Sequence, residues 1–96
     1  MSLNLPIRDW QGQRVWLVGA STGIGRALSK QLHALGATVI LSARKADALQ
    51  NFVEQHPRSI ALPLDVTDRA AVQKAADAAL GGGPLDLVFY CVGHYH

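Results

Sequence analysis

The sequence predicts an α/β protein with a parallel sheet that helices cover on both faces. Short apolar runs alternate with amphipathic stretches of helical length, and each connection between apolar runs can hold a helix. The run at 15–18 is apolar at every position, which is typical of a strand buried on both faces. Because strand–helix–strand connections are right-handed, we expect a three-layer, doubly wound sheet with strand order 3-2-1-4.

Four strands and three helices are expected, in the order β-α-β-α-β-α-β. Strands are predicted at 14–18, 38–43, 59–64 and 85–91, and helices at 23–35, 46–55 and 67–80. Gly36 and Pro57 end the first two helices, and the glycines at 81–83 with Pro84 end the third. Pro63 lacks a ladder donor, which favours an edge position or a strand end.

Each predicted helix has one apolar face that should be buried. The expected inward residues are Ile24, Ala27, Leu28, Leu32 and Leu35, then Ala46, Leu49 and Val53, then Val72, Ala75, Ala76 and Ala79. Residues 1–13 are predicted to be irregular, with Trp10 covering an edge of the core. The remaining residues, 14–96, are expected to form one small domain.

Composition and charge exclude several classes of protein. The 96 residues have a net charge of +2 and scattered basic residues, which argues against a nucleic-acid surface. The one cysteine, Cys91, rules out an internal disulfide and fits the cytoplasm, where we expect the protein to be located. We expect neither a signal peptide nor a membrane partner, because no apolar run approaches roughly 18 residues.

Three glycines, Gly19, Gly23 and Gly25, lie between the first strand and the first helix in the stretch GASTGIG. Gly19 permits a tight turn, and the other two let a ligand or a strand approach the backbone closely. The N–H groups at a helix start have no intrahelical partners and attract anions. Within a βαβ unit this pattern predicts a dinucleotide pyrophosphate, the alternative being a turn that only packs.

Arg44 and Lys45 follow the second strand, where a dinucleotide site often has an acidic residue for the ribose 2′-hydroxyl. No carboxylate occurs there before Asp47. A guanidinium binds a 2′-phosphate bidentately and stacks on adenine, so this pair favours NADP(H) over NAD(H). The alternative is a solvated basic pair at a helix start, where a cation is mildly unfavourable.

Asp65 and Val66 follow the third strand. A carboxylate at this position can accept a hydrogen bond from the adenine amino group while Val66 packs on the ring. The alternative is structural: Asp65 or Thr67 caps the third helix, and Asp68 lies in its first turn. Capping by one residue and nucleotide contact by another are compatible.

The fourth strand ends at Tyr90-Cys91-Val92-Gly93. In the order 3-2-1-4 this end lies beside the first strand, at the switch point where ligands bind. Gly93 lets the backbone come close to the cofactor. We expect Cys91 to be a small buried residue rather than a nucleophile, because no motif activates it.

The histidines do not predict a metal site. His94 and His96 are two residues apart at the end of the chain, and further ligands are lacking. His33 and His56 are expected on helix surfaces. We therefore expect no bound metal.

Together these residues resemble the short-chain dehydrogenase/reductase family of Rossmann-fold enzymes over essentially the whole chain. The glycine stretch is similar to the family's Gly-x-x-x-Gly-x-Gly, Asp65-Val66 to its adenine motif, and 90–93 to its Asn-Asn-Ala-Gly. The resemblance implies that the glycine stretch binds the phosphates and that Gly93 lies against the nicotinamide-side ribose. The candidate cofactor-binding residues are Gly19, Ser21, Thr22, Gly23, Ile24, Gly25, Arg44, Lys45, Asp65, Val66, Cys91, Val92 and Gly93.

The chain departs from the family pattern at three places. Val18 stands where the family commonly has Thr, and Cys91 stands where it has Asn, so each loses a side-chain hydrogen bond. The family's catalytic Tyr-x-x-x-Lys does not occur, because no Lys follows Tyr90 or Tyr95. We therefore expect no catalytic residue here and interpret 14–96 as a truncated Rossmann unit, incomplete because it lacks the catalytic half.

The expected function is NADP(H) binding, as the N-terminal part of a short-chain dehydrogenase/reductase-type oxidoreductase that is inactive by itself. The alternative is a non-catalytic module that senses NADP or self-associates through the strand at 85–91. Its apolar row of Leu85, Leu87, Val88 and Phe89 has no charge after Asp86, and an unprotected edge strand recruits another strand.

Overall fold

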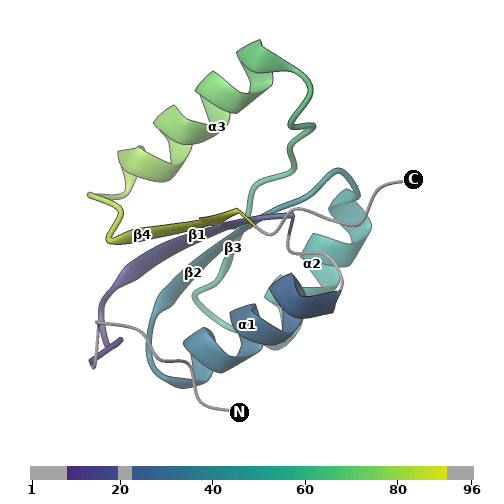
Figure 1. Ribbon diagram of the computed structural model, residues 1–96. Helices are drawn as coiled ribbons and strands as arrows, with labels where there is room; N and C mark the ends of the chain where they lie inside the picture. The colour runs from purple at the N-terminus through teal and green to yellow at the C-terminus, as the bar shows by residue number, and fades with distance from the viewer. Residues whose placement is uncertain (1–8, 20–22, 91–96) are drawn as a thin grey trace.

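The computed structural model describes residues 9–19 and 23–90 (Figure 1). The elements are β1 (Arg14–Val18), α1 (Gly23–Ala34), β2 (Thr38–Ser42), α2 (Ala46–Gln55), β3 (Ile60–Ala61), α3 (Arg69–Gly81) and β4 (Leu87–Tyr90). This confirms the predicted order of strands and helices. Within the described ranges, none of the helices has the length and apolar character needed to span a bilayer.

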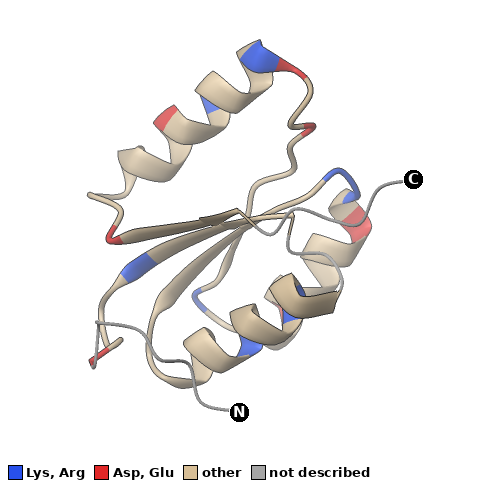
Figure 2. Cartoon of the chain, in the orientation of Figure 1, with Lys and Arg blue, Asp and Glu red and all other residues tan. Residues whose placement is uncertain are grey.

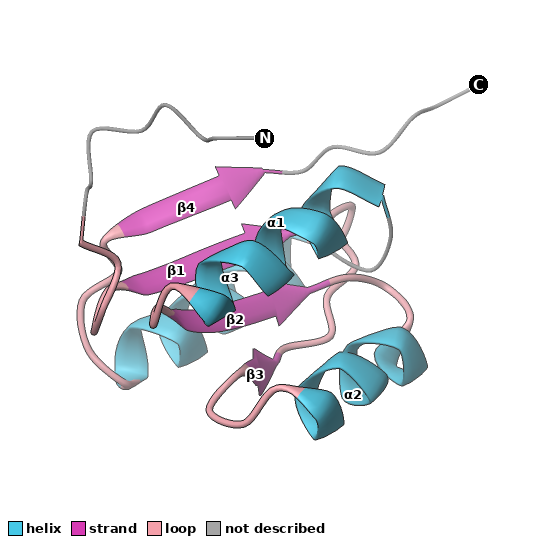
Figure 3. Ribbon diagram, turned by 90° about the horizontal axis from the view of Figure 1, so that it is seen from below, coloured by secondary structure: helices cyan, strands magenta, loops and turns pink. Residues whose placement is uncertain are grey.

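The strands form a parallel sheet in the order β3-β2-β1-β4, as predicted (Figure 3). The carboxyl ends of the parallel strands lie together, and we call this end of the sheet its carboxyl edge. There Val18 of β1 is paired with Ser42 of β2 and with Tyr90 of β4. Figure 1 shows α1 and α2 on one side of the sheet and α3 on the other. The predicted three-layer architecture is therefore confirmed, and three strand ends meet at one edge.

The third strand is shorter than the predicted 59–64. The paired strand covers only Ile60–Ala61, but the Leu62 N–H donates to the Leu41 carbonyl at 2.8 Å and the Leu64 N–H to the Ala43 carbonyl at 2.9 Å. Pro63 lies between these two donors, where an N–H would face away from β2. The proline is tolerated because β3 is at the edge of the sheet, as predicted.

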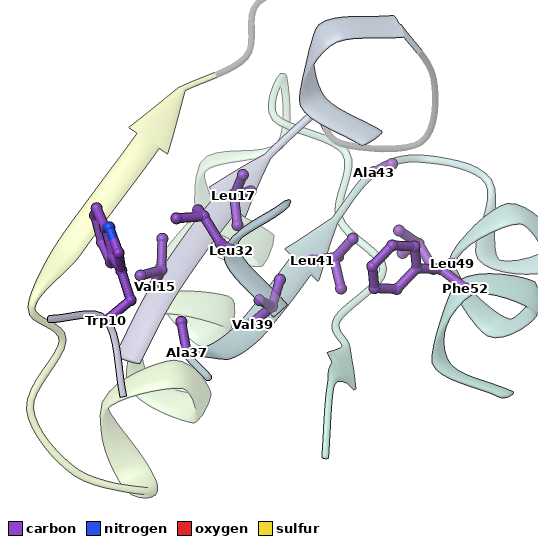
Figure 4. Close-up of a cluster of buried hydrophobic side chains, with 10 residues drawn as sticks. All are labelled: Trp10, Val15, Leu17, Leu32, Ala37, Val39, Leu41, Ala43, Leu49 and Phe52. Atoms are coloured by element: carbon purple, nitrogen blue, oxygen red, sulfur yellow. The ribbon is translucent and has the colours of Figure 1, made fainter. Parts of the chain in front are cut away.

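Both faces of the sheet carry apolar side chains, because alternate residues of a strand point to opposite faces. The cluster beneath α1 and α2 comprises Trp10, Val15, Leu17, Leu32, Ala37, Val39, Leu41, Ala43, Leu49 and Phe52 (Figure 4). The cluster beneath α3 comprises Trp16, Val18, Ile40, Leu64, Ala75 and Ala79. Trp10 is buried, which confirms that the segment before β1 covers part of the core.

The buried face of α1 differs from the predicted face. Leu32 is fully buried and Leu28 is partly buried, as expected, but three predicted inward residues are exposed: Ile24, Ala27 and Leu35. Ser29 is fully buried instead, and its hydroxyl donates to the Gly25 carbonyl at 2.7 Å. This internal hydrogen bond satisfies the hydroxyl without water, so a polar residue can face the sheet.

The faces of the other two helices are closer to prediction. In α3, Ala75 and Ala79 are buried as expected. In α2, Leu49 is buried, but Ala46 is exposed and Phe52 is the second fully buried side chain. The apolar face of α2 is therefore rotated toward Phe52, whose large ring fills the space over β2 and β3.

Arg14 organises the amino edge of the sheet. Its Nη2 donates to the Ala79 carbonyl at 2.6 Å, near the C-terminus of α3. Its backbone N–H donates to Asp86 Oδ2 at 2.8 Å, and the Asp86 N–H donates back to the Arg14 carbonyl at 2.9 Å. A Cβ on Gly82 would lie 2.8 Å from Arg14 Nη2. The glycine loop after α3 therefore lets the backbone close over the guanidinium.

Candidate dinucleotide site

The turn after β1 begins at Gly19, whose φ of 84° is in the left-handed region that favours glycine. The Gly19 N–H donates to the Ser42 carbonyl at 2.6 Å. This bond ties the first residue of the glycine stretch to the last residue of β2. Two predicted phosphate-contacting residues, Ser21 and Thr22, lie outside the described residues.

The helix after this turn starts at Gly23, which has a φ of 62°. Ile24 is 84% exposed, whereas Gly25 is buried. The first helical turn thus presents an apolar side chain to the outside while a residue without a side chain faces the sheet. The N–H groups of this turn have no acceptor within the helix itself, because they precede its first complete turn.

Arg44 and Lys45 lie in the connection between β2 and α2, and both are exposed. Figure 2 shows basic colouring where this connection meets α2. Lys45 is the N-cap residue of α2, and its side chain makes no capping hydrogen bond. The N-terminus of α2 is therefore next to two cations, and the acidic residue of its first turn is Asp47.

Asp65 lies beside Arg44 at the carboxyl edge. The Leu64 N–H donates to the Ala43 carbonyl at 2.9 Å, and this bond aligns the segment that leads to Asp65 with the segment that leads to Arg44. Asp65 Oδ1 accepts from the Thr67 hydroxyl at 2.7 Å and from the Thr67 N–H at 3.0 Å. These two bonds lower the pKa of the Asp65 carboxyl below its ordinary 3.8; the Arg44 charge adds to the lowering, and desolvation opposes it.

The cap of α3 is Asp68, which corrects the expectation that Asp65 or Thr67 would cap this helix. Asp68 Oδ1 accepts from the Ala71 N–H at 3.2 Å, and the helix begins at Arg69. Asp65 and Thr67 are instead joined to each other in the turn that precedes the cap. The Asp65 side chain is therefore not needed to start α3, and Val66, 36% exposed, lies next to it.

The structure brings together the ends of β1, β2 and the third strand, with Gly19, Arg44 and Asp65 following them in turn. The fourth predicted segment is Cys91, Val92 and Gly93, which lies outside the described residues, as do His94 and His96. Across 9–19 and 23–90, three or more potential metal-ligating side chains do not gather at any point.

His33 and His56 pack between α1 and α2 and are only partly exposed. Their rings meet edge to face with centroids 5.0 Å apart, and His56 stacks on Phe52 at 3.8 Å. His33 Nε2 hydrogen-bonds the Pro57 carbonyl at 2.7 Å. The expectation that both histidines lie on helix surfaces is therefore only partly right, because each also contacts the neighbouring helix.

Two residues that hydrogen-bond site residues were not predicted from the sequence: Thr67, which bonds Asp65, and Ser42, which bonds Gly19. Thr67 follows Asp65 at a spacing of two, which is the spacing of an Asx turn and is a usable local signal. Ser42 accepts a hydrogen bond from Trp16 Nε1 at 2.8 Å, across 26 residues of sequence. No local pattern links these two residues, because their contact depends on the register of β1 and β2.

Comparison with known proteins places this geometry in a family. A family model described as short chain dehydrogenase matches residues 13–96. Mouse "Dehydrogenase/reductase SDR family member 7" is 37% identical over 95 residues, which covers 81% of this chain and 28% of that protein. L-xylulose reductase of Bos taurus is 38% identical over 78 residues, covering 80% of this chain and 30% of the reductase.

Solved structures of related proteins have the same fold. Hydroxysteroid dehydrogenase from Escherichia coli has a TM-score of 0.83 and 26% identity, covering 88% of this chain and 38% of that chain. A short chain dehydrogenase/reductase from Burkholderia phymatum, in complex with NAD, has a TM-score of 0.79 and 30% identity, covering 85% and 31%.

A third structure also contains a cofactor. The 3-ketoacyl-(acyl-carrier-protein) reductase from Brucella melitensis, complexed with NADH, has a TM-score of 0.77 and 25% identity, covering 81% of this chain and 33% of the reductase. The chain spans less than half the length of each of these relatives. The match to the family model over residues 13–96 shows that this chain belongs to the short-chain dehydrogenase family.

Proposed function

We propose that this chain is the cofactor-binding N-terminal part of a short-chain dehydrogenase/reductase-type oxidoreductase and that it prefers NADP(H) to NAD(H). The observation that carries the preference is the exposed Arg44, two residues after the end of β2 and at the same edge as the Gly19 turn. A guanidinium at this place matches a 2′-phosphate, whereas a carboxylate would match the free 2′-hydroxyl.

The residues at the edge suit the parts of such a cofactor. Gly19, Gly23 and Gly25 allow close backbone approach for the pyrophosphate, with Ser21, Thr22 and Ile24 as further phosphate contacts. The proposed contacts for the remaining groups are Arg44 and Lys45 for the 2′-phosphate, Asp65 and Val66 for adenine, and Gly93 for the nicotinamide-side ribose. Cys91 and Val92 are further proposed cofactor-binding residues. The exposed Ile24 supports this, because a bound nucleotide would cover an apolar side chain that is otherwise in water.

Asp65 suits the adenine amino group because only one of its two oxygens is used by the described residues, which leaves Oδ2 as an acceptor for a ligand. Oδ1 holds both Thr67 donors. A carboxyl whose pKa is at or below the ordinary 3.8 is ionised at neutral pH, so Asp65 acts only as an acceptor. The Arg44 charge interacts electrostatically with the Asp65 carboxylate, but the two side chains form no salt bridge within the described residues. Its guanidinium thus remains available to an added phosphate.

The cofactor supplies hydride transfer at its nicotinamide ring. This chain's own residues would bind and orient the adenosine and pyrophosphate, and we propose that the chain performs no hydride transfer by itself. Four residues after Tyr90 the chain has His94 rather than a lysine, which would lower the pKa of a tyrosine proton donor.

Calorimetric titration with NADPH and NADH tests this proposal. We expect NADPH to bind more tightly, and Arg44→Met to weaken NADPH binding by about tenfold or more while NADH binding changes little, because only NADPH carries the 2′-phosphate. Lys30→Met is the matched control, since Lys30 is also exposed but lies on α1 away from the strand ends. Equal affinities for the two cofactors, or no binding of either, would refute the proposal.

A second proposed function is self-association, alone or together with NADP sensing. It is supported by β4, which is at one edge of the sheet within the described residues and where Val88 is 49% exposed and Tyr90 61% exposed. An apolar edge with unpaired backbone groups recruits a further strand. Sedimentation of the parent chain at roughly tens of micromolar should show a dimer. Val88→Lys should give a monomer at the same concentration, because a lysine on an edge strand opposes pairing with a further strand. A monomeric parent chain would exclude this function.

A further inference from the structure

Ser42 is held from two directions. Its hydroxyl accepts from Trp16 Nε1 at 2.8 Å, and its carbonyl accepts from the Gly19 N–H at 2.6 Å. Ser42 is fully buried and Trp16 is 7% exposed. The bond between Trp16 and Ser42 is therefore shielded from water, whereas Gly19, the donor of the second bond, is exposed. A hydrogen bond shielded from water is strong, and an unmade one there is costly.

The position of Ser42 makes these bonds relevant to the site. In the parallel ladder Trp16 is paired with Ile40, and Ser42 is two residues farther toward the carboxyl edge. The indole therefore reaches diagonally along the α3 face toward the ends of the strands. Ser42 is the last residue of β2, and Arg44 follows two residues later.

We propose that Trp16 is a positioning residue for dinucleotide binding: by holding the Ser42 hydroxyl it fixes the end of β2 relative to the glycine turn. This rests on the proposed cofactor site. Gly19 and Arg44 are the two points at which the chain would hold the pyrophosphate and the 2′-phosphate. Ser42 connects them, because one of its groups bonds the turn and its backbone leads directly to Arg44.

The second tryptophan provides a matched comparison. Trp10 is 6% exposed and belongs to the cluster beneath α1 and α2, on the opposite face from Trp16. Its indole has no bond to a strand end among the described residues. A Trp-to-Phe change at either position removes a similar volume from a core, but only the change at Trp16 removes a donor to Ser42.

The experiment measures the Kd of the 96-residue chain for two probes, ADP-ribose and 2′-phospho-ADP-ribose, which differ only in the 2′-phosphate. We expect Trp16→Phe and Ser42→Ala each to weaken both probes and to weaken the 2′-phosphorylated probe more, so that the affinity ratio falls by about threefold or more. The double variant should be no worse than either single variant, because both remove the same bond. Ser42→Thr, which keeps the hydroxyl, should retain the wild-type ratio.

Trp10→Phe should lower thermal stability to a similar extent while leaving both Kd values unchanged. The proposal is overturned if Trp16→Phe behaves like Trp10→Phe, or if the effects of Trp16→Phe and Ser42→Ala on Kd are additive. A wild-type chain that binds neither probe would instead refute the proposed function, so the two failures are distinguishable.

Discussion

The two ends of the sheet each carry an arginine next to a strand, and the two arginines have opposite surroundings. At the amino edge the Arg14 guanidinium donates to the Ala79 carbonyl and lies under the glycine loop that follows α3. At the carboxyl edge Arg44 is exposed, and no side-chain hydrogen bond to another described residue holds it. Arg14 is therefore part of the packed fold, although its buried Nε has no hydrogen-bond partner among the described residues. The Arg44 side chain faces water instead.

Two acidic residues at the carboxyl edge, Asp68 and Asp65, also differ in whether their side chains take part in the fold. Asp68 caps α3 through the Ala71 N–H, so its charge stabilises a helix N-terminus. Among the described residues, the Asp65 side chain is hydrogen-bonded to Thr67 and does not cap a helix. Asp68 therefore supports the fold, and Asp65, in the same short loop, is the residue proposed to contact the cofactor. The following predictions test this division, from the largest expected effect to the smallest.

Arg14→Met should lower the free energy of unfolding by about 2 kcal/mol, because it removes a charged donor from the C-terminal end of α3. Urea denaturation followed by circular dichroism measures this. Arg14→Lys keeps one cationic donor and should lose less. A stability within about 0.5 kcal/mol of wild type for Arg14→Met would mean that the amino edge does not depend on this arginine.

Asp68→Ala should cost about 1 kcal/mol of unfolding free energy, since it removes the side-chain acceptor of the α3 N-cap. The same denaturation experiment applies. Asparagine is nearly as good an N-cap as aspartate, so Asp68→Asn should retain most of the stability. If Asn and Ala were equally destabilising, the charge rather than the hydrogen bond would be the source of the effect.

Arg44→Met, the same substitution as at the amino edge, should change the unfolding free energy by less than about 0.5 kcal/mol, as expected for an exposed residue that no side-chain hydrogen bond ties to the described part of the chain. Its effect should appear only in cofactor binding. A destabilisation as large as that of Arg14→Met would show that Arg44 has a structural partner, and the contrast between the two edges would fail.

Thr67→Val should raise the pKa of the Asp65 carboxyl toward its ordinary value, because the hydroxyl is the largest cause of the lowering. A lowered pKa in the folded state contributes stability above the unfolded pKa, and that contribution is lost as the pH falls through the folded pKa. The variant should therefore lose less stability than wild type on acidification below 3.8. Carboxyl-carbon NMR titration measures the pKa, with Thr67→Ser as the control that keeps it low.

Much of the candidate site could be predicted because its signals are local. The glycines at Gly19 and Gly23 occur at positive φ, where the pattern of a strand followed by glycines and a helix predicts a turn. Arg44 and Asp65 could be placed at one edge because parallel strands have their carboxyl ends together. The partners of these residues could not be predicted in this way. Thr67 was missed although it lies two residues away, because it was interpreted as a helix cap.

The sequence by itself determined the order of strands and helices and, on the expectation of a doubly wound sheet, the strand order β3-β2-β1-β4. Hydrophobic periodicity and glycine or proline signals act over a few residues, so they can be recognised without a structure. Tertiary structure decided that Ser29 rather than Ile24 faces the sheet, that Arg14 caps α3 and that Trp16 holds Ser42. Each of these depends on which residues of distant segments come within hydrogen-bonding distance, and only the packed register of strands and helices sets that.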